Sequence, residues 1–191
     1  MKIKRAVECG DNIRERLAEV YVNAFYDDVL NYFSKDKAKL IKIFACGFML
    51  EYFYVAIMDN KIVGMVACMG KGQICFKKNI KTLIKYLGVF RGLTTNFLLN
   101  QFINEFPKIN EETALIEYLV TDTKHLRKGI ASKLIKSLFT STEYKKYLLE
   151  VAGKNTKAIN LYEKLGFKAV YRKYYFPMSY IGMVYTKENN I

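Results

Sequence analysis

The most informative stretch of this sequence is Glu117-Tyr-Leu-Val-Thr-Asp-Thr-Lys-His-Leu-Arg-Lys-Gly-Ile-Ala131. It begins as an apolar strand, passes through a polar loop and enters a helix. In that helix Ala131, Leu134, Ile135 and Leu138 recur at i, i+3, i+4 and i+7 spacing, which predicts one buried face. The stretch therefore predicts a strand that a polar turn joins to an amphipathic helix.

The polar turn has the features of an anion site. Gly129 lets the backbone approach a ligand closely, and Ala131 is small for the same reason. The free N–H groups at a helix N-terminus, the helix dipole and the cations Arg127 and Lys128 all favour negative charge. A diphosphate fits such a turn. The alternative is a solvated basic loop whose glycine only starts a helix.

This segment resembles the acetyl-CoA-binding motif of the GNAT superfamily of N-acetyltransferases. In that motif a strand leads into an Arg/Gln-x-x-Gly-x-Gly/Ala turn whose amides hold the diphosphate of the cofactor. The six positions here are Leu126-Arg127-Lys128-Gly129-Ile130-Ala131. The glycine and the final small residue match, whereas Leu126 stands where the family has Arg or Gln. His125, Arg127 and Lys128 are the candidates to supply the missing charge.

A second motif lies downstream, in Leu149-Glu-Val-Ala-Gly-Lys-Asn155-Thr-Lys-Ala158-Ile-Asn-Leu161-Tyr162-Glu-Lys-Leu-Gly166-Phe167. It resembles the strand-helix-strand element of the same superfamily. From the residues alone, Ala158, Leu161, Tyr162 and Leu165 form one helical face, and Gly166 ends the helix in a left-handed cap. On that pattern Tyr162 fits a core position as well as a catalytic one. The resemblance is specific over residues 113–176 and looser over the strands at 52–69.

The resemblance implies direct transfer of an acetyl group from acetyl-CoA to an amine, with no covalent enzyme intermediate. It also implies that two strands splay apart between residues 119–121 and 149–152, so that pantetheine pairs with the open edge. Backbone N–H groups near Leu119 and Val120 would polarise the thioester carbonyl and stabilise its oxyanion.

The resemblance implies a set of site residues. Asn155 would bind pantetheine or a backbone group near it, and Tyr162 would protonate the departing thiolate. The expected cofactor contacts are Leu119, Val120, Thr121, Arg127, Lys128, Gly129, Ile130, Ala131, Ser132, Asn155 and Tyr162.

The acceptor amine is mostly protonated at neutral pH, so a base, or a water chain to a base, is needed. Glu117 is the first candidate, because it lies on the strand before the turn in an arrangement that resembles the family's I-E-x-L pattern. Alternation along the strand predicts that Glu117 shares a face with Leu119 and Thr121. Tyr118 and Val120 are expected on the opposite face. Glu117 could equally bind the cation of the substrate or be a structural acid, and Glu150 is the reserve base.

The remaining periodicity predicts one mixed α/β domain. The sequence favours helices around 13–25, 36–49, 130–140 and 156–165, two more within 76–106, a short opening strand, and strands at 52–58, 61–69, 114–120, 147–152, 167–176 and 179–185. The resemblance implies a mostly antiparallel twisted sheet flanked by helices. We expect a single domain over 1–191, with a variable helical segment at 72–112 and the acetyl-CoA-binding core at 113–176.

Three local signals refine this organisation. Asn12 followed by Glu15 resembles a capping box at the start of the first helix. Asp59-Asn60 suits the turn of a tight hairpin between two apolar strands. The apolar run Ile43 to Met58 is about as long as the shortest membrane span, but Glu51 interrupts it and its second half favours a strand.

Composition excludes several chemistries. His125 is the only histidine, and the cysteines Cys9, Cys46, Cys68 and Cys75 form no C-x-x-C pair, so no metal site is expected and Cys-His or Ser-His catalysis is disfavoured. Four buried free thiols in a reducing compartment are expected instead. The N-terminus is charged from the start and lacks the apolar segment of a secretory signal, which makes the cytoplasm the default location.

The charge balance favours anionic partners. The 31 Lys and Arg against 18 Asp and Glu give a formal net charge of +13. Residues 124–173 alone hold thirteen basic and three acidic side chains, which motivates a nucleic-acid- or ribosome-associated alternative. Most of those lysines fall on the solvated faces of helices, and no nucleic-acid-binding motif accompanies them, so nucleic acid is an unlikely partner. A non-catalytic acyl-CoA-binding module is the second alternative.

The expected partners are therefore acetyl-CoA and an amine acceptor, with no membrane, in a monomer or homodimer. Nothing in the sequence identifies the acceptor. Aromatic residues of the early helices, the middle segment and the late strands are candidates for its pocket, although each fits the core equally well: Phe25, Tyr26, Tyr32, Phe33, Phe90, Phe97, Tyr174 and Tyr175.

Overall fold

The computed structural model describes residues 1–27, 30, 33–103, 107–175 and 178–187, apart from the side chains of 100–103 and 175. Within them the helices are α1 Arg14–Phe25, α2 Lys37–Gly47, α3 Ile80–Leu87, α4 Val89–Ile103, α5 Ile130–Ser141 and α6 Thr156–Lys164. The strands are β1 Lys2–Arg5, β2 Phe53–Met58, β3 Lys61–Met69, β4 Thr113–Thr121, β5 Lys146–Ala152, β6 Lys168–Tyr175 and β7 Met178–Thr186.

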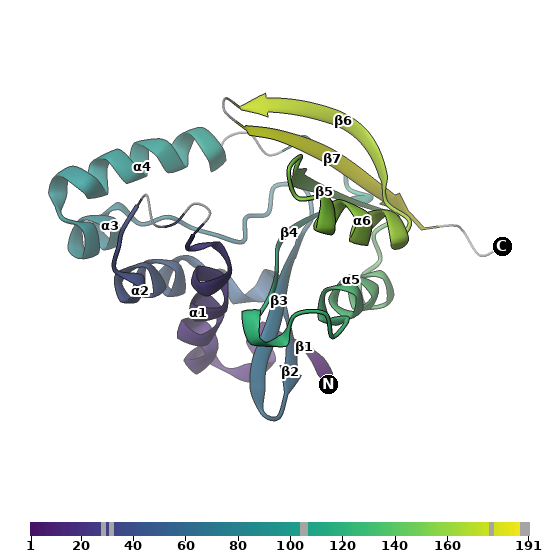
Figure 1. The fold of residues 1–191 in the computed structure, drawn as a ribbon, viewed down its shortest axis with the longest axis horizontal. Helices are drawn as coiled ribbons and strands as arrows, with labels where there is room; N and C mark the ends of the chain where they lie inside the picture. Colours follow the sequence, from purple (N-terminus) through teal and green to yellow (C-terminus); the bar gives the residue numbers. More distant parts are fainter. Residues whose placement is uncertain (28–29, 31–32, 104–106, 176–177, 188–191) are drawn as a thin grey trace.

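In the described residues the strands form one seven-stranded sheet in the order β1-β2-β3-β4-β5-β7-β6. Only the β4–β5 pair is parallel; the other neighbours are antiparallel. Helices α1 and α2 lie on one face of the sheet and α5 and α6 on the other (Figure 1). The predicted fold class, a mixed and mostly antiparallel sheet flanked by helices, is confirmed.

Two hydrophobic cores hold these layers together. The first lies between the sheet and α1 and α2, and includes Leu17, Phe44 and Phe53. The second lies between the sheet and α5 and α6, and includes Leu134 and Tyr147. Because the central strands β3 and β4 contribute to both cores, they are covered on both faces. The functional site therefore has rigid support at the middle of the sheet.

The β2–β3 hairpin turns at Asp59 and Asn60, as predicted. Both residues take the left-handed conformation, with φ of 48° and 58°, which is the geometry of a two-residue type I′ turn. The apolar run that precedes this hairpin divides between α2 and β2. Within the described part of the chain, no helix has the length and hydrophobicity that crossing a bilayer requires.

The first helix starts differently from the prediction. Asn12 lies in a short 3-10 turn, η2 Asp11–Ile13, and Ile13 occupies the N-cap position of α1. No side chain caps the helix, so the predicted capping box is wrong. Instead, Asp11 pairs with Arg14 at 3.1 Å, because the 3-10 turn brings these two side chains together.

The middle segment contains the two predicted helices, α3 and α4. The chain turns between them at Gly88, whose φ is 82°. Gly92 lies inside α4, against α3. A Cβ there would come within 2.8 Å of the Ile84 backbone, so the glycine allows the two helices to pack closely.

The thiols are only partly buried. Cys68 and Cys75 are buried, Cys9 is partly exposed and Cys46 is exposed, so the prediction of four buried thiols is wrong for Cys9 and Cys46. Burial raises the pKa of Cys68 to about 12, which leaves this thiol protonated and unreactive at neutral pH.

Candidate active site

Strands β4 and β5 part in the middle of the sheet. They pair in parallel from Thr113 and Lys146 as far as Ile116 and Leu149. Both strands then continue, β4 to Thr121 and β5 to Ala152, and the described residues form no further β4–β5 pairs. The predicted splay is therefore present, and it begins one to two residues earlier on β4 than the predicted 119–121.

A bulge on β4 lies where the strands part. On the neighbouring strand, Met65 pairs with Val120 and Ala67 pairs with Glu117. Two residues of β4, Tyr118 and Leu119, thus lie opposite the single residue between those pairs. Tyr118 takes a left-handed conformation with φ of 51°. An extra residue of this kind bends the strand and changes the direction of its side chains.

The predicted alternation holds for Tyr118, Leu119 and Val120, but the bulge changes the face on which Glu117 lies. Val120 and Tyr118 pack in the core on the α1 side, and Leu119 packs in the core on the α5 side. Glu117 lies on the α1 side as well, because it pairs with Ala67 of β3, which packs in that core. The prediction that Glu117 shares a face with Leu119 is therefore wrong, because the extra residue shifts the alternation by one.

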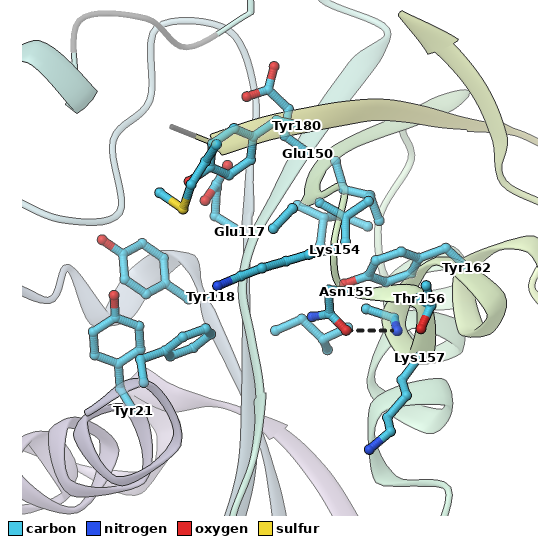
Figure 2. A pocket seen from close by; sticks show the side chains of 18 residues that line it. Tyr21, Glu117, Tyr118, Glu150, Lys154, Asn155, Thr156, Lys157, Tyr162 and Tyr180 are labelled. Carbon is cyan, nitrogen blue, oxygen red and sulfur yellow. Dashed lines mark hydrogen bonds between the residues drawn. The ribbon is translucent and has the colours of Figure 1, made fainter. Parts of the chain in front are cut away.

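A cavity of about 850 Å³ opens between the parted strands. The N-terminal half of α6 and its preceding loop line one side, and α1 and β7 line the other (Figure 2). The lining residues are Tyr21, Phe25, Ile116, Glu117, Tyr118, Leu119, Leu149, Glu150, Val151, Ala152, Lys154, Asn155, Thr156, Lys157, Ala158, Tyr162, Met178 and Tyr180.

Glu117 reaches this cavity from the bulged part of β4. Burial and, to a smaller extent, the nearby charge of Glu150 raise the pKa of its carboxyl group to about 8. Figure 2 shows the carboxyl group close to Tyr180. A carboxyl group with a pKa near 8 accepts a proton far more readily than an ordinary glutamate, and this is the property that a general base needs.

Glu150, the reserve base, has other partners. Its Oε1 atom lies 2.9 Å from Nζ of Lys173 and accepts a hydrogen bond from the hydroxyl group of Tyr171. Its side chain is 18% exposed. Because a cation and a hydroxyl group hold this carboxylate, the geometry favours Glu117 over Glu150 as the proton acceptor.

Tyr162 lies on the first two turns of α6, with its ring 5.8 Å from that of Phe167. The residue is 8% exposed, and its hydroxyl end points toward Asn155 in Figure 2. Burial, together with the charge of Glu117, raises the pKa of Tyr162 to about 12. The phenol is therefore protonated at neutral pH and can donate a proton.

The position of Tyr162 is fixed by both ends of α6. At the C-terminal end, Gly166 has φ of 90° and the N–H group of Phe167 donates to the carbonyl of Tyr162 at 3.0 Å, as in a Schellman cap. At the other end, Asn155 is the N-cap, and its Oδ1 accepts from the N–H group of Ala158 at 3.1 Å. Asn155 thus binds a backbone group, one of the two roles expected for it.

The predicted phosphate turn follows β4 directly. Arg127 and Gly129 take left-handed conformations, with φ of 62° and 71°, immediately before α5 begins. No described side chain caps α5, and Arg127, Lys128 and Gly129 are exposed. The first N–H groups of the helix lack partners within the helix and lie beside these cations, so this turn is suited to an anion.

The turn also shows which side chains lie near the expected diphosphate. Ile130, rather than Ala131, belongs to the buried stripe of α5, so Ile130 offers a ligand only its backbone. Ala131 and Ser132 are half-buried. Leu126, at the position usually held by Arg or Gln, is an exposed apolar residue and brings no charge.

An ion pair ties this turn to α1. Asp122 accepts from the N–H group of Lys124 at 2.9 Å, which caps the 3-10 turn η5 Thr123–His125. The other carboxyl oxygen of Asp122 pairs with Arg16, whose guanidinium also donates to the carbonyl of Ile62 at 2.9 Å. Nδ1 of His125 is buried 3.8 Å from Asp122. This nitrogen therefore faces the ion pair rather than solvent.

The structure thus separates the predicted residues into two groups. The cavity brings together Glu117, Leu119, Asn155 and Tyr162, whereas the side chain of Val120 is buried in the core on the α1 side. The phosphate turn lies beyond the end of β4 and does not line the described cavity.

Sequence reasoning missed the far end of the cavity. Tyr21, Met178 and Tyr180 line it. Tyr21 and Tyr180 were assigned only to the first helix and the last strand, and Met178 fell between the two predicted late strands. Of the aromatic residues proposed for an acceptor pocket, Phe25 is a lining residue. Phe90, Phe97 and Tyr174 are instead exposed. Tyr32 and the side chain of Tyr175 lie outside the described residues.

Comparison with known proteins identifies the same architecture. The chain resembles an N-acetyltransferase from Staphylococcus aureus with a TM-score of 0.66, at 18% identity, over 97% of this chain and 100% of that one. It resembles a protein from Pyrococcus horikoshii with a TM-score of 0.63, at 24% identity, over 98% of each chain. A third, a putative acetyltransferase from Salmonella typhimurium that was solved with acetyl-CoA, has a TM-score of 0.59 at 13% identity over 99% of this chain and 95% of that one.

These likenesses establish the fold, and no curated protein sequence matches the chain. The family model described as Acetyltransferase (GNAT) family matches residues 14–167. That range contains α1, the parted strands, the phosphate turn and α6 up to Phe167. Because the match spans most of the sequence, the chain belongs to the GNAT acetyltransferase family.

Proposed function

We propose that this protein transfers the acetyl group of acetyl-CoA directly to a primary amine. The observation that carries the proposal is the cavity between β4 and β5, in which Glu117 and Tyr162 lie on opposite sides of the gap. One is a carboxyl group with a raised pKa and the other a protonated phenol. Family membership and the acetyl-CoA-bound Salmonella protein support the choice of cofactor.

The cofactor would lie along the gap, with its diphosphate at the start of α5. Gly129 in its left-handed conformation opens that turn, and Arg127 and Lys128 supply positive charge beside it. The pantetheine arm would add to the sheet at the free edges of β4 and β5. Further contacts with the cofactor would come from backbone groups or short side chains of Val120, Thr121, Ile130, Ala131 and Ser132.

The reaction moves protons at both side chains. The protonated amine first passes one proton to Glu117, directly or through water, and the neutral nitrogen then attacks the thioester carbon to form a tetrahedral oxyanion. This intermediate collapses as the carbon–sulfur bond breaks, and the second amine proton leaves to solvent. Tyr162 then donates its proton to the departing thiolate. Backbone N–H groups near Leu119 would stabilise the oxyanion between these events.

The acceptor would enter from the end of the cavity lined by Tyr21, Phe25, Met178 and Tyr180. These side chains offer aromatic and apolar surface, and Glu117 offers the carboxyl group that an ammonium group approaches. We therefore expect an amine with an apolar substituent to be a better acceptor than a polycation, which the net charge of +13 repels.

Ligand-induced stabilisation tests the proposal. Acetyl-CoA binds only the folded protein, so a concentration one hundred times its dissociation constant should stabilise the fold by about 2.7 kcal/mol and raise the melting temperature. A thiol-release assay with an amine panel then measures turnover. No stabilisation at millimolar acetyl-CoA would refute the proposal, whereas stabilisation without thiol release from any amine would favour a non-catalytic acyl-CoA-binding module.

A further inference from the structure

Helix α4 exposes an apolar surface that the active site does not use. Five of its described side chains are large, apolar and exposed. Leu98 is 46% exposed, and the other four are more than half exposed: Val89, Phe90, Leu93 and Phe97, at 64%, 80%, 52% and 62% of their full area. We refer to these four residues as the α4 patch. At about 100° per residue they fall within about 100° of the helix circumference, so they form one continuous stripe.

The opposite side of α4 is the buried one, and it carries small residues. Gly92 lies against Ile84 of α3, and Thr95 is only 7% exposed. A helix on the surface of a soluble protein normally buries its large apolar residues and exposes its polar ones. The orientation of α4 is the reverse, which is expected only where the exposed side has a partner.

The described elements leave the α4 patch uncovered. Helix α4 packs on α3, and α3 in turn packs on α2. Figure 1 shows α4 at the margin of the molecule, away from the faces of the sheet that α1 and α5 cover. Any occupant of the patch must therefore come from outside the described residues.

The charge around the patch indicates the chemistry of that occupant. Residues 60–103 contain seven Lys or Arg and no Asp or Glu. Lys81 and Lys85 are exposed on the side of α3 opposite buried Leu83, and Arg91 is exposed on α4 itself. Exposed aromatic and aliphatic side chains together with exposed cations are the combination that binds an anionic lipid surface.

We propose that the α3–α4 hairpin docks on an anionic phospholipid surface. The α4 patch would enter the boundary between headgroups and acyl chains, and Lys81, Lys85 and Arg91 would contact the phosphates. A second copy of the chain fits less well, because two such faces would bring cations together with no acidic residue from 60–103 between them. This is a peripheral contact, so it requires no spanning helix.

A single tryptophan gives a direct readout, since the chain contains none. In Phe97→Trp, vesicles of equal parts phosphatidylcholine and phosphatidylserine should shift the emission to shorter wavelength, and brominated lipids should quench it. Vesicles of phosphatidylcholine alone should do neither. The matched control is Val7→Trp, which replaces an exposed apolar residue near the N-terminus and should give no shift with either vesicle.

Sedimentation with the same anionic vesicles tests each part of the surface. Phe90→Ser combined with Phe97→Ser, and separately Lys81→Glu combined with Lys85→Glu, should each lower binding about tenfold. The control variant Lys136→Glu combined with Lys164→Glu changes the net charge by the same amount as the Lys81 and Lys85 variant, but on the exposed sides of α5 and α6. This control should retain most of the vesicle binding. All these positions are on the surface, so the melting temperature without vesicles should stay within a few degrees.

Four outcomes would overturn the proposal. The first is that the unmodified protein does not bind the vesicles, and the second is that the double serine variant binds them fully. The third is that the Lys136 and Lys164 variant loses as much vesicle binding as the Lys81 and Lys85 variant. The fourth is that the unmodified protein forms a dimer, which the serine substitutions dissociate, while neither protein binds vesicles. The last result would assign the α4 patch to a second copy. Since none of these residues lines the cavity, acetyl-CoA stabilisation should be unchanged throughout, which separates this test from that of the proposed function.

Discussion

At the scale of single residues, Glu117 links stability to pH. In the folded protein its carboxyl group keeps a proton up to a pH of about 8, whereas the ordinary pKa is 4.5. Between these two values the folded state binds more protons than the unfolded state, so the free energy of unfolding falls as the pH rises. Glu117→Gln removes the titration while preserving the size of the side chain.

We therefore expect the melting temperature of Glu117→Gln to exceed that of the unmodified protein at pH 8.5, and the difference to shrink toward pH 5. Thermal denaturation across this range measures it. Glu163→Gln, at an exposed position of α6, should follow the unmodified protein. Parallel curves for the unmodified protein and Glu117→Gln would show that the pKa of Glu117 is close to its ordinary value.

The carboxyl group of Glu117 should also determine how the rate of acetyl transfer depends on pH. If Glu117 is the base, kcat/KM should rise with pH through about 8, because the free enzyme must lose that proton before it can accept one from the amine. In Glu117→Gln the rise should disappear and kcat should fall by about 10²-fold or more. An unaltered alkaline rise would exclude Glu117 and direct attention to Glu150 or a water chain.

Tyr162 should affect turnover without affecting binding. Its phenol is protonated at neutral pH, so Tyr162→Phe removes a proton donor but keeps the ring that packs against Phe167. We expect kcat to fall by about 10²-fold, with the acetyl-CoA-induced rise in melting temperature retained. Tyr144→Phe, which alters a phenol outside the cavity lining, is the matched control. Equal turnover in Tyr162→Phe and the unmodified protein would assign Tyr162 to the core alone.

At the scale of elements, the sequence predicts those turns and helix ends whose geometry depends on one or two neighbouring residues. Asp59 and Asn60 tolerate a left-handed backbone conformation, so these two residues alone predict the hairpin turn. Gly166 predicts the end of α6 for the same reason. The bulge at Tyr118 could not be predicted in this way, because tyrosine carries no signal for a positive φ. Pairing with β3 imposes that conformation, and with it the true orientation of Glu117.

Other features arise only from packing between elements. The periodicity of α4 predicted a helix, but not that Gly92 would face α3 and leave Phe90 exposed. Tyr21 and Tyr180 meet at one cavity although α1 and β7 lie at opposite ends of the sequence. The two motifs of the chain predict the cofactor half of the proposed site, whereas the proposed acceptor half depends on tertiary contacts that no single segment encodes.

The turn before α5 provides a test at this scale. Gly129 has φ of 71°, and nothing lies within 4 Å of the place where a Cβ would be. Gly129→Ala therefore meets no steric obstacle, but its backbone is strained by about 1–2 kcal/mol in the left-handed region. Gly72, with φ of 74° and equally open space, is the matched control.

Both alanine variants should lower the melting temperature by similar amounts, because the strain is the same. Only Gly129→Ala should weaken acetyl-CoA binding, by about tenfold, since its backbone must relax away from the geometry that presents the amides of α5. Isothermal titration measures the affinity. Equal affinity in the two variants would remove the turn from the cofactor site.

At the scale of the whole molecule, the charge of +13 acts in two ways. In the proposed complex, Arg127 and Lys128 would attract the diphosphate at contact distance. Of the other described Lys and Arg residues, Lys154 and Lys157 line the cavity and the rest do not. Raising the salt concentration from 0.1 M to 1 M shortens the screening length from about 10 Å to about 3 Å, which suppresses the distant charges more completely than the adjacent ones.

The two contributions can therefore be separated by measuring acetyl-CoA affinity against salt. Arg127→Met combined with Lys128→Met should weaken binding about tenfold at 0.1 M salt and flatten the salt dependence. Lys136→Met combined with Lys164→Met removes the same charge from the exposed sides of α5 and α6, and should change the affinity less than twofold. Equal weakening by both pairs would contradict a local contact between the turn and the diphosphate. The overall positive charge of the protein would then explain how the chain binds a diphosphate although Leu126 stands in place of a cation.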